Sequence, residues 1–171
     1  FSFNNPHGAC SHCDGLGTDM FFDPELTVPN HSLSLADGAI APWTNSGSQF
    51  YHQTLESLGK QFGFKLTTPW SKLKKKYQNI ILHGSDGTEV TMHYHDGKQS
   101  YKIHKVFEGV LPNMERRWQE TDSSWVREDL SKFQITKICE TCNGNRLKQE
   151  SLAVKINNQL IGNVAHMTID E

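Results

Sequence analysis

The chain has 171 residues, a formal net charge of −2, 36% hydrophobic residues and 21% charged residues. Nine Phe, four Trp and four Tyr supply enough apolar surface for a core, which excludes wholesale disorder. The net charge excludes a global basic field toward nucleic acid, although a local basic patch is compatible with it. No apolar run is long enough to span a bilayer and no secretory signal is recognisable, so we expect a cytoplasmic protein without a membrane partner.

The first predicted element is a metal-binding knuckle, Cys10-Ser11-His12-Cys13, set among glycines. The x-x spacing lets both thiolates turn toward one metal ion. Only two other cysteines exist, Cys139 and Cys142, and they have the same spacing. Four thiolates are typical of structural Zn²⁺, so the sequence predicts one zinc site, with His12 exposed to solvent. Disulfides and a redox dithiol are the alternatives, but no oxidising compartment or thioredoxin-like pattern is indicated.

The distance between the two knuckles indicates the domain organisation. Cys13 and Cys139 are 126 positions apart, whereas a compact zinc module needs only a few tens of residues between its knuckles. A structureless loop of that length is improbable, so the excursion is expected to fold separately. We therefore predict an α+β protein: a zinc-bound, β-rich knuckle base formed by residues 1–20 and 134–171, and a mixed α/β insertion domain formed by residues 21–133.

The first half of the excursion reads as irregular chain and helix. Residues 23–48 are rich in Pro, Gly, Ser and Asn and predict an irregular connection with short elements. Apolar residues at helical spacing predict an amphipathic helix over 50–62, which Gly63 would end. A second short helix is expected to begin near Pro69, and residues 80–82 form a buried apolar run.

The second half predicts a hairpin followed by helices. Residues 90–95 alternate between apolar and polar side chains, Asp96-Gly97 is a hairpin turn signal, and the alternation resumes at 101–103. The remaining predicted elements are helices over 110–120 and from 123 or 124 to 133, a strand over 152–156 with a turn at Asn157-Asn158, and a partner strand over 161–164. Thr168 and Glu171 have the spacing of a capping box that opens another helix. Because the chain also begins at Phe1, we expect it to be an excised piece of a larger protein.

Basic residues cluster at three places beside aromatic residues, as nucleic-acid contact would require. For any single cluster, a solvated surface is the alternative. His93 and His95, with His104 across the hairpin, form either a second metal site or a solvated strand face. The candidate DNA-contacting residues are Lys72, Lys74, Lys75, Lys76, Lys98, Lys102, Lys105, Arg116 and Arg117.

The sequence carries no catalytic motif that can be argued from spacing. There is no Gly-x-x-x-x-Gly-Lys-Ser/Thr loop for nucleotide phosphates and no His-Glu-x-x-His. Triads are assembled in space, so no Ser/His/Asp set follows from the sequence. We therefore expect this chain not to be an enzyme by itself.

Three stretches together carry a family resemblance: FSFNNPxGACxxCDGLG at 1–17, FEGVLPNMERR at 107–117 and CxxCxGxRLKxESLAV at 139–154. They resemble the UvrA family of bacterial nucleotide excision repair. The resemblance runs through the whole chain and is weakest over 30–105. It implies a dimeric ABC-type ATPase that recognises damaged DNA, in which this chain would be the insertion domain of the first ABC module with its zinc base.

The resemblance also implies where the family's other activities lie. The Walker motifs, the ABC signature and the UvrB-binding domain have no counterpart here, so ATP, UvrB and homodimer contacts are expected outside this chain. The insertion domain is expected to help clamp damaged double-stranded DNA, with a lysine-lined face of residues 72–105 contacting phosphates. The run Lys74-Lys75-Lys76 matches no family motif.

Two alternative functions come from other classes. The first is a structural spacer or lever, anchored by zinc, that does not touch DNA. The second is a DnaJ-type zinc chaperone module, since Cys-x-x-Cys-x-Gly-x-Gly is also typical of that family. Four closely spaced repeats would then be expected, whereas this chain has two distant ones and Arg146 stands where the second repeat would end in Gly.

Overall fold

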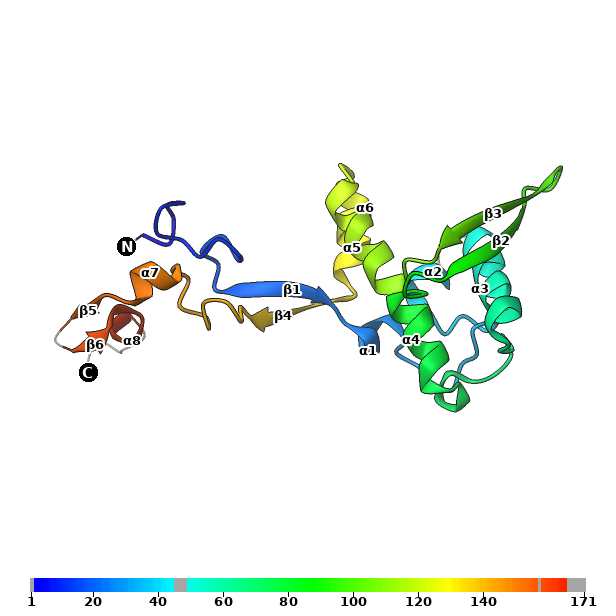
Figure 1. Ribbon diagram of the computed structural model, residues 1–171, viewed down its shortest axis with the longest axis horizontal. Helices are drawn as coiled ribbons and strands as arrows, with labels where there is room; N and C mark the ends of the chain where they lie inside the picture. The colour runs from blue at the N-terminus through cyan, green and yellow to red at the C-terminus, as the bar shows by residue number, and fades with distance from the viewer. Residues whose placement is uncertain (1, 45–48, 157, 166–171) are drawn as a thin grey trace. The chain divides into compact units, whose positions relative to one another are not determined.

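The computed structural model describes residues 2–44, 49–156 and 158–165, and Figure 1 shows their helices and strands. The chain divides into two compact units: one comprises Phe1–Phe21 with Ile135–Glu171, and the other comprises Phe22–Gln134. The boundaries expected from the sequence lie one residue from these. The mixture of helices and strands, together with the clustered cysteines, confirms the predicted α+β class.

Most elements belong to the unit of residues 22–134. The predicted helix over 50–62 is confirmed as α3, and the hairpin is confirmed as β2 and β3. The two later helices are confirmed as α5 and α6. In chain order the elements are α1 (Pro24–Thr27), α2 (Ala41–Thr44), α3 (Gln49–Phe62), the 3₁₀ helix η1 (Trp70–Lys72), α4 (Lys75–His83), β2 (Glu89–His95), β3 (Ser100–Val106), α5 (Val110–Glu120) and α6 (Ser124–Ser131).

One hydrophobic core holds the unit of residues 22–134 together. Leu58, Ile81, Met92, Val110 and Met114 are all completely buried in it. They come from α3, α4, β2 and α5, which explains why each of these elements presents one apolar face. The apolar run at 80–82 is part of α4, a helix that the sequence analysis did not assign.

The hairpin has one strand that is covered and one that is open. Ser57 Oγ of α3 accepts from the His93 N–H at 2.9 Å, and Gln53 Oε1 accepts from the His95 N–H at 3.0 Å. Gln53 Nε2 also donates to the His95 carbonyl at 2.9 Å. These side chains satisfy the edge of β2, while β3 lies along the other side of the hairpin (Figure 1).

The other unit has little regular structure. Strand β1 (Thr18–Phe22) pairs with β4 (Gln134–Ile138), and the chain passes between the units in these two strands. The remaining elements are α7 (Gln149–Leu152), β5 (Lys155–Ile156), β6 (Gln159–Leu160) and α8 (Ile161–Ala165). Among the helices of the described residues, none is long and apolar enough to cross a membrane.

The C-terminal part differs from the sequence-based expectation. The predicted strand over 152–156 is shortened to β5, because Leu152 closes α7 by donating its N–H to the Lys148 carbonyl. The partner strand expected over 161–164 is wrong, since these residues form α8. Gly162 of α8 comes so close to Asn145 that an added Cβ would lie 2.5 Å from Asn145 Oδ1. Residue 157 of the expected turn and the expected capping box at 168–171 lie outside the described residues.

Candidate metal centre and nucleic-acid interface

The two Cys-x-x-Cys segments are joined through their backbones. The Cys10 N–H donates to the Arg146 carbonyl at 2.8 Å, and the Cys139 N–H donates to the Gly17 carbonyl at 3.0 Å. Each bond therefore links one cysteine to the segment that carries the other pair. All four cysteines are buried, with exposed fractions of 5% or less.

The two segments also repeat one backbone conformation. After Cys13, Asp14 and Gly15 have φ of 50° and 78°, and after Cys142, Asn143 and Gly144 have φ of 49° and 80°. In each case the N–H three residues after the cysteine donates to that cysteine's carbonyl at 2.9 Å. Left-handed conformations of this kind favour Gly, Asn and Asp, which explains the residue choice. At Gly15 the space is also closed, because a Cβ would lie 2.0 Å from the Phe3 carbonyl oxygen.

The four sulfurs meet at one point. All four Sγ atoms lie within 4.8 Å of one another, and Cys13 Sγ is 3.7 Å from Cys142 Sγ. A disulfide would need about 2.05 Å, and all four cysteines are free. The cluster could therefore hold a metal ion. His12 lies beside it, with its side chain 57% exposed and its Nε2 3.2 Å from Asp19 Oδ2.

Burial dominates the acid–base chemistry of two of these thiols, Cys139 and Cys142. It raises the pKa of Cys139 to about 12 and also raises the pKa of Cys142. Burial opposes ionisation of Cys13 as well, but the Gly17 N–H, 3.2 Å from Cys13 Sγ, and the neighbouring cysteines outweigh it and lower the pKa of Cys13. A metal ion bound here would have to displace thiol protons, so its affinity falls as the pH falls.

The lysine run at 72–76 lies on the surface at the start of α4. Lys72, Lys74, Lys75 and Lys76 are all exposed. The neighbouring Trp70 is only 4% exposed, so its ring belongs to the core. Lys76 Nζ lies 4.7 Å from the centre of the Tyr77 ring.

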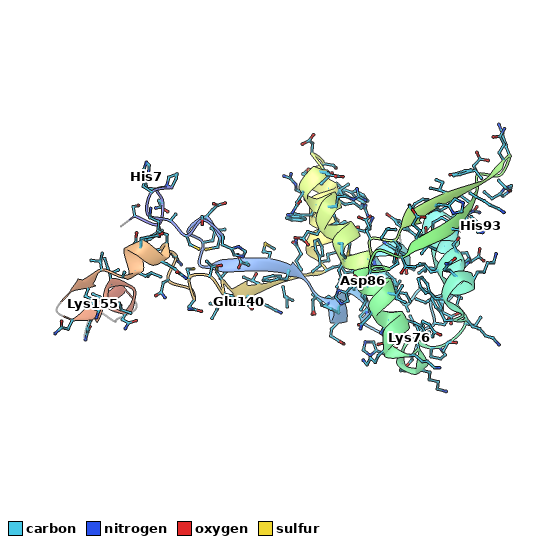
Figure 2. The ribbon with its side chains drawn as sticks, viewed as in Figure 1. His7, Lys76, Asp86, His93, Glu140 and Lys155 are labelled. Carbon is cyan, nitrogen blue, oxygen red and sulfur yellow. The ribbon has the colours of Figure 1, made fainter. Side chains whose placement is uncertain are left out.

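A second basic group decorates the hairpin. Strand register places Thr91 opposite His104, His93 opposite Lys102 and His95 opposite Ser100, so these six side chains share one face, which we call the outer hairpin face. Lys98 lies in the turn, where its N–H donates to Asp96 Oδ1. Lys105 is on the opposite, inner face. Figure 2 shows Lys76 well separated from His93, so the two groups do not form one continuous face.

The three hairpin histidines are not assembled as a metal site. His104 Nδ1 is 3.1 Å from Thr91 Oγ1, and His95 Nδ1 is 3.1 Å from Ser100 Oγ. In the part of the chain that the structure describes, no cluster of potential metal ligands includes any of the three. The solvated strand face is the alternative that fits, since all three histidines are exposed.

The two arginines of α5 are engaged within the protein. Arg116 donates to Glu108 through Nε at 3.1 Å and Nη2 at 2.8 Å, and to Glu120 through Nη1 at 2.9 Å. Arg117 Nη1 lies 3.3 Å from the Tyr51 hydroxyl. The Arg116 contact, with a further bond from Asn113, holds the pKa of Glu108 below its usual value. The structure thus gives Arg116 a structural contact that sequence reasoning could not show.

We expect Arg116→Gln to reduce stability more than DNA affinity. The substitution leaves Glu108 with fewer hydrogen-bond partners. It should lower the free energy of unfolding by only roughly 1 kcal/mol, because both side chains are partly exposed and water screens their attraction. Since the pKa of Glu108 is lowered by folding, its contribution is present above the unfolded pKa and is lost as the pH falls through the folded value. The free energy of unfolding in urea would be measured for variant and wild type at neutral and acid pH. The difference between the two proteins should be smaller at acid pH. A DNA-affinity loss as large as that of a hairpin lysine variant would contradict this assignment.

Sequence reasoning missed an aromatic group beside Lys105. Phe50 stacks on Tyr94 with ring centres 4.7 Å apart, and Tyr94 contacts Tyr101 at 5.6 Å. Tyr94 and Tyr101 are direct cross-strand partners. Alternation on either side of the turn places both tyrosines on one face, but their direct pairing follows from the four-residue loop 96–99. The place of Phe50 depends on the packing of α3 and had no signal in the sequence.

Comparisons with known proteins agree with this architecture. The family described as "UvrA DNA-binding domain" matches residues 23–132. Over 169 residues the chain is 53% identical to the UvrABC system protein A of Brucella abortus and, in a separate comparison, of Agrobacterium fabrum; each alignment covers 99% of this chain and 17% of the relative. The crystal structure of UvrA2 from Deinococcus radiodurans superposes with a TM-score of 0.75 and 23% identity, covering 95% of this chain and 21% of that one, which supports the fold.

These similarities decide between the families that the sequence left open. The chain spans about 17% of the length of the curated relatives that it matches. The chaperone alternative has no support, because the matched family covers most of the excursion between the knuckles, where a DnaJ-type module would have its further repeats. The chain belongs to the UvrA DNA-binding domain family.

Proposed function

We propose that the chain is the DNA-binding insertion domain, with its zinc-bound base, of a UvrA-type damage-recognition ATPase. It would help to clamp damaged double-stranded DNA during nucleotide excision repair. The observation that carries the proposal is the family match over residues 23–132, which coincides with the compact unit of residues 22–134. The base would be part of the signature domain of the first ABC module.

The four cysteines fit zinc in particular. Zinc–sulfur bonds of about 2.3 Å in a tetrahedron place two sulfurs about 3.8 Å apart, and Cys13 Sγ and Cys142 Sγ are 3.7 Å apart. Four buried thiol ligands leave no position for water, which is typical of a structural site. Zinc would hold together the two knuckles, Cys10/Cys13 and Cys139/Cys142. The DNA-binding unit of residues 22–134 lies between them in the sequence.

The outer hairpin face is the surface best suited to phosphates. Its six side chains are hydroxyls, imidazoles and one ammonium, and the acidic Glu89 lies on the same face only at the far end of β2, opposite Val106. Over the whole hairpin, Lys98, Lys102 and Lys105 are opposed by Glu89 and Asp96 only, so it carries positive charge in a chain whose net charge is −2. A two-stranded ribbon is also narrow enough for the major groove of B-DNA. Phosphate contacts and DNA shape would dominate such binding.

The other activities of the relatives are assigned to parts of the protein outside this chain. We place ATP binding and hydrolysis, the UvrB contact and the homodimer contact there, and we propose that this chain is not itself an enzyme. The protein would act in the cytoplasm, where bacterial DNA lies.

A salt titration tests direct DNA binding. Wild type, Lys102→Gln and Lys98→Gln would be titrated with a fluorescent duplex at several salt concentrations, with zinc content measured in each sample. Each hairpin variant should weaken binding several-fold and make the slope of log K against log salt shallower by about 0.9 for each lost phosphate contact. Lys60→Gln, an exposed lysine on α3, is the matched control and should leave both quantities unchanged.

The same measurement separates the clamp from the spacer. Reversing the charge of Lys72, Lys74, Lys75 and Lys76 would show whether the second basic group contributes. If the folded, zinc-loaded chain bound no duplex even at low salt, the proposal would fail and the domain would act as a positioned lever. If Lys60→Gln and Lys102→Gln lost DNA affinity equally, only the overall charge of the chain would matter. That result would contradict the proposal that the hairpin contacts phosphates.

A further inference from the structure

The inner face of the hairpin carries an aromatic surface that phosphate binding does not use. Phe50, Tyr94 and Tyr101 follow one another in ring contact, with Phe50 and Tyr94 almost parallel at an interplanar angle of 8°. Phe50 and Tyr101 are 42% and 46% exposed, whereas Tyr94 between them is 3% exposed. Ile103, also 41% exposed, continues the surface along β3. We call these four side chains the aromatic platform.

A contact with helix α3 holds the central ring of the platform in place. The Tyr94 hydroxyl is 3.1 Å from Thr54 Oγ1 of α3, which fixes the central ring between helix and hairpin. Because α3 packs along β2, it does not cover the inner face of β3, where Tyr101 and Ile103 are presented to solvent. Rings that are already ordered lose little conformational entropy when a ligand stacks on them.

A positive charge lies over the platform. Lys105 Nζ is 5.4 Å from the ring centre of Phe50 and 5.7 Å from that of Tyr94. Lys105 makes no ion pair within 4 Å among the described residues, although its charge contributes to lowering the pKa of Glu108, which lines the adjoining cavity. An aromatic surface with a lysine at its border matches the two parts of a nucleotide, a planar base and a charged phosphate.

A cavity of about 250 Å³ adjoins the same two residues. Phe50 and Lys105 line it, together with Trp43, Tyr51, Asn113 and Arg116. At roughly 30 Å³ per water, this volume equals about eight water molecules, which is room for one planar base. Asn113, which lines this wall, has an Oδ1 atom that is buried and has no hydrogen-bond partner within the described part of the chain.

We propose that the aromatic platform, with Lys105 and the adjoining cavity, binds one unpaired or unstacked nucleobase of DNA. The base stacks on the Phe50 end of the platform and Lys105 meets the neighbouring phosphate. The inference rests on the proposed DNA-binding function and adds to it a preference for a locally opened duplex over a fully paired one. Lesions that unstack a base would then be retained longer by this domain.

The test compares two duplexes of one sequence, one fully paired and one with a single unpaired 2-aminopurine. Wild type should bind the second more tightly by about tenfold and quench 2-aminopurine fluorescence, the result of stacking on one or two rings. Phe50→Leu and Tyr101→Leu, which keep an apolar side chain, should each reduce this preference several-fold without changing the salt dependence. Phe50→Tyr keeps the ring and should keep the preference.

Trp125→Leu is the matched control. Trp125 is 72% exposed on α6 of the same unit and takes no part in the platform. Binding of both duplexes with equal affinity, without quenching, would overturn the platform and leave the proposed function intact. Failure to bind even the paired duplex would overturn the proposed function. If Trp125→Leu lost as much of the preference for the unpaired base as Phe50→Leu, exposed aromatic surface would be acting non-specifically. That result would also overturn the proposed role of the aromatic platform.

Discussion

Replacing Cys139 with serine is expected to abolish tight metal binding and to unfold the cysteine-centred unit, while the unit of residues 22–134 keeps its structure. Cys139 is completely buried at the point where the four sulfurs meet. Loss of a ligand should cost more than the 10–100-fold in metal affinity that is typical of losing an outer-shell partner. Zinc content after dialysis, together with limited proteolysis, would measure both effects.

The physical reason is that this unit has almost no other core. Apart from the four cysteines, its buried hydrophobic residues among those described are Ala9 and Leu147. Structural zinc binding contributes roughly 10–16 kcal/mol in small modules, and their apo forms are unfolded. The other unit has a large aliphatic and aromatic cluster of its own and does not need the metal.

His12→Ala is the control for the cysteine experiment. His12 lies between two cysteines but is exposed and paired with Asp19, so this variant should retain stoichiometric zinc. Zinc should also be released as the pH falls, because thiolates that lose the metal take up protons. Full zinc content and protease resistance in Cys139→Ser would contradict a site that depends on all four cysteines.

The cluster of four cysteines could be predicted from spacing, but the contacts that assemble it could not. Two Cys-x-x-Cys pairs without a fifth cysteine leave few alternatives for a metal site. The bonds from Cys10 to Arg146 and from Cys139 to Gly17 connect positions more than a hundred residues apart, and no local pattern encodes them. The repeated left-handed residues at 14–15 and 143–144 were signalled only by residue type, Asp-Gly and Asn-Gly, and not by any longer pattern.

The fold was predictable where a local pattern and a turn signal agreed. Alternation over 90–95 and the Asp96-Gly97 turn signal predict the hairpin and which side chains share a face. The register that places His93 opposite Lys102 follows from a four-residue loop, 96–99, which the turn signal alone does not fix. At 161–164 there was no such agreement, because a stretch of four residues with two apolar side chains fits a strand or a helix. The structure has Gly162 packed close to Asn145, which no local pattern shows. The lysines at 72–76 are exposed, as a solvated surface would require, but the sequence could not show that Arg116 is paired with Glu108.

The base of the hairpin depends on two glycines that meet. Gly84 ends α4 with φ of 105°, and Gly109 precedes α5 with φ of 95°. Ser85 locks this junction: its N–H donates to the Phe107 carbonyl at 2.8 Å, and its hydroxyl oxygen accepts from the Phe107 N–H at 2.9 Å. An added Cβ on Gly109 would lie 2.5 Å from Gly84 N and 2.8 Å from the Leu82 carbonyl oxygen.

Gly109→Ala is therefore expected to destabilise the unit of residues 22–134 by about 2–5 kcal/mol. A left-handed conformation costs roughly 1–2 kcal/mol for a residue with a Cβ, and forcing an atom into packed backbone adds about 1–3 kcal/mol. Gly63→Ala is the matched control: Gly63 has φ of 80° but nothing within 4 Å of an added Cβ, so only the conformational part should be lost. Urea unfolding followed by tryptophan fluorescence would compare the two variants. Equal losses would show that the Gly84–Gly109 junction can open, and the outer hairpin face and the aromatic platform would then lack the rigid base on which their binding depends.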